Sequence, residues 1–497
     1  LKSFLGESNF QKSIKQYLNR YKNSTVTSND LLQTIEEVSG VEVQIFFDQW
    51  IYRKGHPEIE IEYTLIRADN DPRNNNLQVN KLKIKVIQTQ SHLVDQAFLP
   101  PYQFELEIKI IIEDILGRRK EIPHLMQISQ WTSESTVEFD RKYSISYISI
   151  DPYYKILKTI RSIKVQNESE DLQLRKILLN QLKFGDTVVE RIQSARMLKN
   201  LFSDQIVNSL RDSIQLDKFY GVGKEAANAI GSFHDRNNYE KSDNAYRALV
   251  SGVLEKKDFE SLNNHVKRVV IKNIGLFERT DSIELFEAIL KDSTTNSDFI
   301  RSAAAAALGS SSKRLSAYKE KKRVLLLLKD IVNNSKSFQS VLATGALEGL
   351  SELSRHNYEN DKEIYIETID FLLQNTHSTK DYFIRAKSTR QLGKYLRNRF
   401  LPLDHKVAEK NHKVFCRLKE LLKDERRKIR MNACEALSDD ESKFAEFPEK
   451  ITYESLLILT ETAKMDLDAF VRRKAETSAN RIRKWIYEWS SRPLSLE

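Results

Sequence analysis

The sequence predicts a mixed, mainly α fold: a helical segment, then a small antiparallel β-sandwich, then an α-solenoid. Two observations carry this prediction. Apolar residues follow helical spacing over residues 1–56, alternate with polar residues over most of residues 57–160, and return to helical spacing from about residue 171. The last region also repeats itself at nearly regular intervals, which is typical of stacked helical pairs. We therefore expect three domains, at residues 1–56, 57–160 and 161–497.

The composition is typical of a soluble globular protein. Of the 497 residues, 40% are hydrophobic and 30% are charged, so sizeable cores are expected. The 79 basic and 70 acidic residues leave a net charge of +9, a mild excess that favours an ordinary solvated surface over a nucleic-acid partner. No apolar run reaches the length of a membrane span, and residues 1–10 do not form a signal peptide, so we expect no membrane association.

The cysteine content and the first residue bear on cellular location and completeness. Cys416 and Cys434 are too few for a disulfide framework or a zinc knuckle, and a reducing, cytoplasmic location fits best. Because the first residue is Leu1 and not Met, we expect the sequence to be part of a longer chain or to follow a cleavage.

Two helices are predicted between residues 27 and 54. Thr27 with Asp30 three residues later is close to a capping box, and Gly40 supplies a left-handed C-terminal residue. A second helix follows at once. Five apolar residues are expected on one of its faces: Val43, Phe46, Phe47, Trp50 and Ile51. Proline ends helical structure at Gly55-His56-Pro57.

From Pro57 the apolar period changes to two, which indicates strands with one solvated face. Ile59, Ile61 and Tyr63 alternate with glutamates, and similar runs occupy residues 82–86 and 104–112. Turn signals separate them at residues 69–72, 100–101 and 116–118. A sandwich of about seven antiparallel strands is the simplest closure, with its last strand at residues 146–150.

The helical region contains eight similar ten-residue blocks. Most begin with an aliphatic residue, carry a small residue one turn later and have Leu or Ile another turn on. Their first residues are Glu190, Val222, Val266, Ile300, Leu342, Ile384, Ile429 and Val471. The spacing matches HEAT or armadillo repeats, in which small residues let paired helices approach closely and neighbours bury each other's apolar faces. Glu190 is the poorest match, because an aliphatic residue belongs there.

The N-terminal part of the chain also resembles a known family, most specifically in the segment from Phe46 to Pro57. The segments LGESNFQKSIKQYLNRYKNSTVTSNDLLQTIEEVSG and FFDQWIYRKGHPEIEIEY are similar to the end of the thermolysin-like domain of the aminopeptidase N family of zinc metallopeptidases, where it passes into a β-sandwich. The resemblance covers roughly residues 1–160. It implies that residues 1–56 are the C-terminal helices of a catalytic domain.

The resemblance further implies a zinc peptidase as the parent protein. In that family two His of a His-Glu-x-x-His helix and a downstream Glu hold zinc, and the Glu of the motif is the general base. This sequence has no such motif, and we place no counterpart of the family's Gly-Ala-Met-Glu-Asn segment or its transition-state tyrosine. We therefore assign no catalytic, cofactor-binding or metal-binding residue, and we expect zinc only in the parent.

A column of arginines is the main candidate site on the solenoid. The arginines that share the second position of their repeats are Arg301, Arg385, Arg430 and Arg472. Such a column could hold phosphates or acidic peptides. A structural ladder, in which each arginine pairs with a carboxylate such as Asp298 or Asp381, is the favoured interpretation.

The remaining motifs have ordinary structural interpretations. Gly221-Val222-Gly223 resembles part of a dinucleotide fingerprint, but no strand precedes it. His405 and His412 are spaced too widely for a helical metal site. Trp485 and Trp489 fit a cap of the last repeat, although a protein partner could also dock there.

Two functions remain open. The chain could be the C-terminal region of a zinc aminopeptidase that removes N-terminal residues from peptides. Peptides would then bind through the missing catalytic domain, the solenoid would limit access, and the fragment itself would be inactive. Alternatively it belongs to a non-catalytic scaffold similar to a transcription-initiation-complex subunit, with protein partners along the solenoid. An intact zinc motif upstream of Leu1 would distinguish them.

Overall fold

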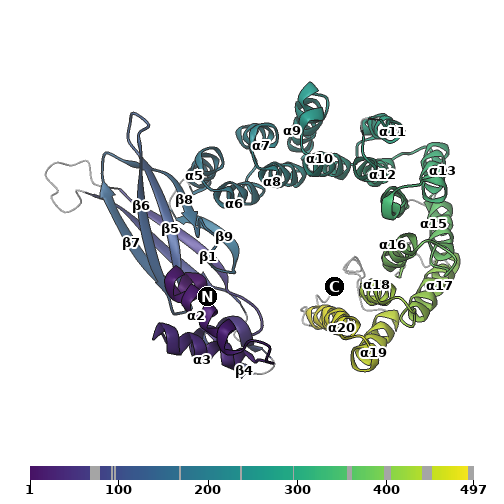
Figure 1. Ribbon diagram of the computed structural model, residues 1–497. Coiled ribbons are helices and arrows are strands. Elements are labelled where there is room, and N and C mark those ends of the chain that lie inside the picture. Colours follow the sequence, from purple (N-terminus) through teal and green to yellow (C-terminus); the bar gives the residue numbers. More distant parts are fainter. Residues whose placement is uncertain are drawn as a thin grey trace. The chain divides into compact units, whose positions relative to one another are not determined.

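The computed structural model describes residues 1–67, 79–90, 93–94, 97–166, 170–235, 238–294, 296–354, 361–396, 405–438 and 450–490. It is 63% helical with small β-sheets, which confirms the predicted mixed, mainly α class (Figure 1). Two compact units are formed by Leu1–Ser209 and Leu210–Glu497. The three-domain division stays a prediction. In the described part of the chain, every helix is too short or too polar to span a bilayer.

The N-terminal helices are α1 (Lys2–Leu5), α2 (Glu7–Arg20), α3 (Ser28–Ser39) and α4 (Gln44–Phe47), the last continued by a π-helical turn at Asp48–Tyr52. The predicted cap of α3 is confirmed, since both the backbone N–H and the hydroxyl of Thr27 donate to Asp30, at 2.7 and 2.8 Å. Gly40 takes the left-handed conformation that was expected of it, with φ of 68°. A small core of Leu5, Leu32, Ile35, Val43 and Phe47 joins these helices.

The single apolar face predicted for the second helix is wrong. Val43 and Phe47 are buried, but Ile51 is 53% exposed and Phe46 and Trp50 are only partly buried. The π-helical turn explains the difference, because its wider ring shifts the register of later side chains relative to an α-helix.

The end of the helical segment, residues 49–56, connects these helices to the sheets. The backbone N–H of Gln103 donates to Gln49 Oε1 at 2.5 Å, and the ring of Trp50 lies 5.5 Å from that of Tyr102. His56 Nε2 lies 2.8 Å from the Thr159 hydroxyl. These contacts hold the end of the helical segment against two separate parts of the β-region, residues 102–103 and Thr159.

Two sheets bury their apolar residues in one shared core. The first has the strand order β7-β2-β1-β9 and the second β6-β5-β8, with a separate β3–β4 pair. The strands are β1 (Glu58–Ile66), β2 (Val79–Gln88), β3 (Leu93–Val94), β4 (Ala97–Phe98), β5 (Phe104–Glu113), β6 (Arg119–Ile128), β7 (Thr132–Asp140), β8 (Ser144–Ile150) and β9 (Thr159–Gln166). The predicted alternation in β1 is confirmed: Ile59, Ile61 and Tyr63 are buried. The turn expected at residues 69–72 lies outside the described residues.

The prediction that the last strand ends near Ile150 is wrong. β9 follows it and pairs with β1 in parallel, so the sheets are not wholly antiparallel. A register shift opposite Ile59 and Glu60 interrupts this pairing. The shift breaks the simple period-two pattern along β9, and this explains why the sequence did not show the strand.

The chain then continues as helices. Their bounds are α5 (Glu170–Phe184), α6 (Val188–Leu198), α7 (Asp204–Leu216), α8 (Tyr220–Gly231), α9 (Tyr239–Leu249), α10 (Asn264–Leu276), α11 (Ile283–Lys291), α12 (Asp298–Ser312), α13 (Tyr318–Asn334), α14 (Val341–Leu353), α15 (Lys362–Gln374), α16 (Tyr382–Leu392), α17 (His405–Leu421), α18 (Arg427–Leu437), α19 (Lys450–Met465) and α20 (Ala469–Ser490). Every one of the eight repeat blocks lies on a helix, from α6 to α20 in steps of two. From α8 onward, each of these helices packs against the next one in the series (Figure 1).

A buried lysine joins the sheets to the first helical pair, which shares their compact unit. Lys109 on β5 is 4% exposed, and its Nζ lies 2.8 Å from Asp186 and 3.1 Å from Glu190. Burial acts to lower the pKa of Lys109, but the hydrogen bonds to Asp186 and Glu190 outweigh it and raise that pKa. Glu190 is fully buried and also accepts the N–H of Thr187 at the start of α6. These two contacts explain why Glu replaces the aliphatic residue of this repeat.

Small residues allow the closest approach between repeats. An added Cβ at Gly309 on α12 would lie 1.9 Å from the carbonyl oxygen of Gly349 on α14, a distance that no atom pair tolerates. Nearby Ala305 on α12 in turn lies against Gly349. The two backbones are therefore in direct contact.

Replacing Gly309 with Ala should destabilise the helical array by about 2–3 kcal/mol, because the new methyl group must push two backbones apart. Urea unfolding followed by circular dichroism measures this. Gly223→Ala is the matched control: its Cβ would meet only ordinary contacts at 3.4 Å, so a neutral or slightly stabilising change is expected. Equal urea midpoints for Gly309→Ala and Gly223→Ala would contradict the close approach of α12 and α14.

Acid should weaken the contact between α14 and α16 through Glu348. Burial acts to raise its pKa, but attraction and a 2.8 Å hydrogen bond from Lys387, with Lys272 and Lys394 nearby, lower it overall. A lowered folded-state pKa gives stabilisation that is present above the ordinary value of 4.5 and is lost as pH falls through the folded value. Glu348→Gln should therefore unfold earlier than wild type at pH 7, and the difference in urea midpoint should shrink below pH 4.5. A difference that does not change with pH would contradict this assignment.

Replacing Lys109 with Met should cost about 3–5 kcal/mol, since it leaves a buried carboxylate without a cation. Adding Glu190→Gln should restore part of the loss by removing that charge. Lys83→Met, on the solvated face of β2 with its side chain 44% exposed, is the control and should change stability by less than about 1 kcal/mol. Losses of the same size at both positions would show that Lys109 has no special role.

Candidate functional site

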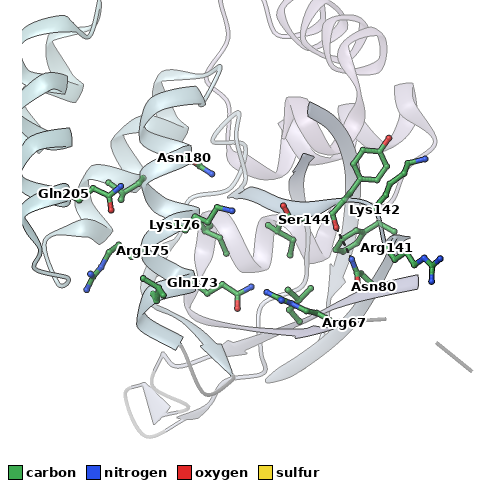
Figure 2. Close-up of a pocket in the computed structure, with 17 residues that line it drawn as sticks. Arg67, Asn80, Arg141, Lys142, Ser144, Gln173, Arg175, Lys176, Asn180 and Gln205 are labelled. Carbon is green, nitrogen blue, oxygen red and sulfur yellow. Dashed lines mark hydrogen bonds between the residues drawn. The ribbon is translucent and has the colours of Figure 1, made fainter. Parts of the chain in front are cut away.

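A groove with a cavity volume of about 990 Å³ lies between α5 and the ends of β1, β2, β7 and β8. Arg175 and Lys176 project from α5 on one side, and Arg67, Arg141 and Lys142 come from the opposite side (Figure 2). Apolar side chains that belong to or pack on the shared core form the floor; they include Leu65, Phe139, Ile145 and Ile177. The groove thus combines an apolar floor with two cationic walls.

Local structure fixes the cations of the sheet wall. β7 ends at Asp140, whose carboxylate accepts the N–H of Lys142 at 2.9 Å and closes a tight turn. Asn80 donates through Nδ2 to the Tyr143 carbonyl at 3.0 Å and anchors the far side of that turn. Arg141 and Lys142 at the tip are exposed.

The groove has an excess of positive charge. Five of its lining residues are Lys or Arg, and none is Asp or Glu. Lys142 pairs with Asp140 at 3.2 Å and Lys176 with Glu113 at 3.8 Å, both carboxylates outside the lining. The hydrogen bond that the ammonium group of Lys142 donates to Asp140 raises the pKa of Lys142. Three arginines remain that form no ion pair among the described residues.

These three arginines are Arg67, Arg141 and Arg175. Arg67 and Arg141 are exposed, whereas Arg175 is partly buried and reaches the Phe202 carbonyl only at 3.5 Å. The Nε of Arg175 is buried without a hydrogen-bond acceptor. A buried donor in this state costs free energy until an acceptor reaches it.

The solvated face of the first sheet shows the opposite arrangement. There each lysine of β2 faces a carboxylate on a neighbouring strand: Lys81 with Glu138 at 2.7 Å, Lys83 with Glu134 at 2.8 Å and Lys85 with Glu62 at 3.3 Å. The lysines of β2 are thus all paired on the open face of the sheet, whereas the three arginines of the groove form no ion pair among the described residues.

The groove was not predicted from the sequence. The sequence feature that could have indicated it is a pair of basic dipeptides, Arg141-Lys142 and Arg175-Lys176. They are 34 residues apart, and only the packing of α5 on β8 brings them to one groove.

The predicted arginine column makes internal contacts. Arg301 Nε donates to the Leu290 carbonyl at 2.9 Å, and its Nη1 lies 3.2 Å from Asp298. Arg472 donates to the carbonyls of Asp466 and Leu467 at 2.8 and 3.1 Å. Arg301 thus links the end of α11 to the start of α12, whereas Arg472 holds the turn that precedes α20.

Two of the arginines also link consecutive repeats. Arg430 contacts Asp466 at 2.9 Å, and Arg385 forms an ion pair with Asp424. The sequence analysis predicted Asp381 as the partner of Arg385. That carboxylate instead caps α16, where it accepts the backbone N–H of Phe383 at 2.9 Å. An Asp at a helix start satisfies the free N–H groups there, and this use competes with a side-chain ion pair.

The remaining candidates fall on ordinary elements. Gly221–Gly223 lies within α8, and Trp485 is 7% exposed in α20, whereas the side chain of Trp489 lies outside the described residues. His412 lies 3.5 Å from the thiol of Cys416. Among the described residues no three His, Cys, Asp or Glu side chains are placed to hold a metal ion. The zinc that the family resemblance implies therefore does not fit the residues that can be seen here.

Comparison with known proteins points to peptidases. Residues 1–50 match the Peptidase family M1 domain. Aminopeptidase M1-C of Oryza sativa subsp. japonica is 36% identical over 62 residues, which are 12% of this chain and 7% of that protein. Probable aminopeptidase 2 of Sulfurisphaera tokodaii is 34% identical over 61 residues, 12% of this chain and 8% of that protein.

A solved structure extends the likeness to nearly the whole chain. Aminopeptidase A of Legionella pneumophila, crystallised in complex with aspartic acid, superposes with a TM-score of 0.55 and 13% identity over 97% of this chain and 55% of that one. At this identity the likeness shows the fold alone. The chain thus spans about half the length of that structure, and its matched segment spans less than a tenth of the curated relatives. Together these matches support a peptidase-related protein with an aminopeptidase-like fold.

Proposed function

We propose that the chain is the C-terminal, non-catalytic region of a zinc-dependent aminopeptidase that removes N-terminal residues from peptides. The observation that carries the proposal is the combination of the M1 match at residues 1–50 with a fold likeness that continues over 97% of the chain. In this proposal α1–α4 complete the catalytic domain, the two sheets form a β-sandwich spacer, and the later helices form a HEAT-like solenoid that limits access to the active site.

Exposed apolar side chains on the N-terminal helices support a missing catalytic domain. Five of them are more than half exposed: Phe4, Leu18, Ile45, Ile51 and Tyr52, at 54, 62, 56, 53 and 54%. Large apolar groups that gather on short helices normally face a partner. The rest of a catalytic domain would cover them.

The geometry of the helices supports the solenoid. From α8 onward each repeat helix packs on the next, at α12 and α14 through Gly309 and Gly349, and partly buried ion pairs add to these contacts. An array of this kind gains stability repeat by repeat and offers a long surface. Zinc, peptide substrates and a cytoplasmic location belong to the parent protein in this proposal.

A scaffold function is the alternative. It is favoured by the same extended array, because such arrays offer long surfaces for binding. In that case protein partners would bind along the solenoid and the parent would hold no zinc.

Zinc content and peptidase activity separate the two. The chain of 497 residues, stripped with chelator and reloaded, should hold no stoichiometric zinc and should not hydrolyse aminoacyl anilides. The native parent, treated in the same way, should bind one zinc ion and hydrolyse them. A parent without zinc or activity would support the scaffold, and a fragment with both would contradict the non-catalytic assignment.

A further inference from the structure

The cationic groove has no role in the proposed peptidase function. We propose that it is a docking site for an acidic peptide segment of a partner protein, one that carries apolar side chains beside its carboxylates. The proposal concerns this surface alone, so it holds or fails independently of whether the parent is an active peptidase.

The positive charge of the groove favours an anionic ligand. Arg67, Arg141 and Arg175 form no ion pair in the described part of the chain, although the solvated face of β2 pairs its lysines one by one. A guanidinium group presents a planar fork of donors that matches a carboxylate in a bidentate manner. Gathering such groups without counter-charges is unfavourable in the free protein, and an anionic ligand removes that penalty.

The shape of the groove argues for a segment over a small anion. Its volume of about 990 Å³ lies at the upper end of ordinary ligand sites. The cations stand on two separate walls, so a single phosphate could satisfy only one of them (Figure 2). A linear ligand with several carboxylates reaches both walls, and its apolar side chains would cover Leu65 and the 66% exposed Leu172.

The neutral polar groups favour a peptide over a nucleic acid. Gln173 and Gln205 line the groove and make no side-chain hydrogen bond within the described ranges. A carboxamide offers both a donor and an acceptor, which match the C=O and N–H of a peptide backbone. The phosphodiester groups of RNA only accept, so they match the donors of a carboxamide but not its acceptor.

Fluorescence anisotropy with the full chain at 0.15 M salt tests the proposal. The probe is a fluorescein-labelled 14-residue peptide that alternates Glu or Asp with Leu or Val. Its isosteric analogue carries Gln and Asn in place of the acids, and a single-stranded 14-nucleotide RNA serves as the nucleic-acid probe. We expect saturable binding of the acidic peptide alone.

The variants locate the binding. The double substitution Arg67→Glu, Arg141→Glu should weaken binding of the acidic peptide at least about tenfold, because it replaces two charge-assisted contacts with repulsion. Lys83→Glu, Lys164→Glu makes the same change in net charge on the paired face and should shift affinity less than about twofold. If the Glu variant melts earlier than wild type, the double substitution Arg67→Gln, Arg141→Gln replaces it, and a loss of about threefold or more is expected.

Three outcomes would overturn the proposal. The first is no binding of the acidic peptide by the wild-type chain. The second is equal weakening by the groove and control substitutions, which would show non-specific attraction. The third is RNA binding of equal strength that responds to the groove substitutions, which would assign the groove to nucleic acid.

Discussion

The buried ammonium group of Lys109 is the interaction on which the arrangement of the first compact unit depends. It lies on a central strand of the second sheet and contacts two carboxylates at the start of α6. A charge withdrawn from water is tolerated only when its partners are in place, so this contact fixes where the helices can begin relative to the sheet. Glu190 adds a second constraint, since the same carboxylate completes the cap of α6.

Further along the chain, contacts of two kinds hold the helices. Close packing at Gly309 and Gly349 sets the distance between repeats, and it tolerates no added methyl group. Ion pairs across about 40 residues, such as Lys321 with Asp361 at 2.7 Å, then set the register of one repeat against the next. Packing gives most of the free energy of such an array, whereas the buried pairs mainly select one arrangement. Arg385 and Arg430 of the predicted column belong to this second group. Arg301 and Arg472 of the same column instead donate to carbonyl groups in the segments that precede their own helices.

The sequence revealed the elements better than their contacts. Helical and period-two spacing identified the class, the capped helix at Thr27 and all eight repeat helices, because these depend on local chemistry. It missed the parallel strand β9, whose pattern is interrupted by a register shift, and the π-helical turn after Phe47, which moves Ile51 to the surface. It also missed the groove, since the importance of Arg67, Arg141 and Arg175 arises only when β1, the β7–β8 turn and α5 meet. Glu190 departs from the aliphatic residue that its repeat position predicts, and this departure marks a buried contact with Lys109.

The length and sequence of the native polypeptide are the most direct test of the proposal that this chain is the C-terminal region of a zinc aminopeptidase. Sequencing the coding DNA upstream of Leu1, together with the intact mass of the native polypeptide, shows what stands before α1. We expect a longer polypeptide whose added residues carry His-Glu-x-x-His and a downstream Glu. A native polypeptide that begins near Leu1, or an upstream region without those zinc ligands, would contradict it and would leave the helical array as the functional surface.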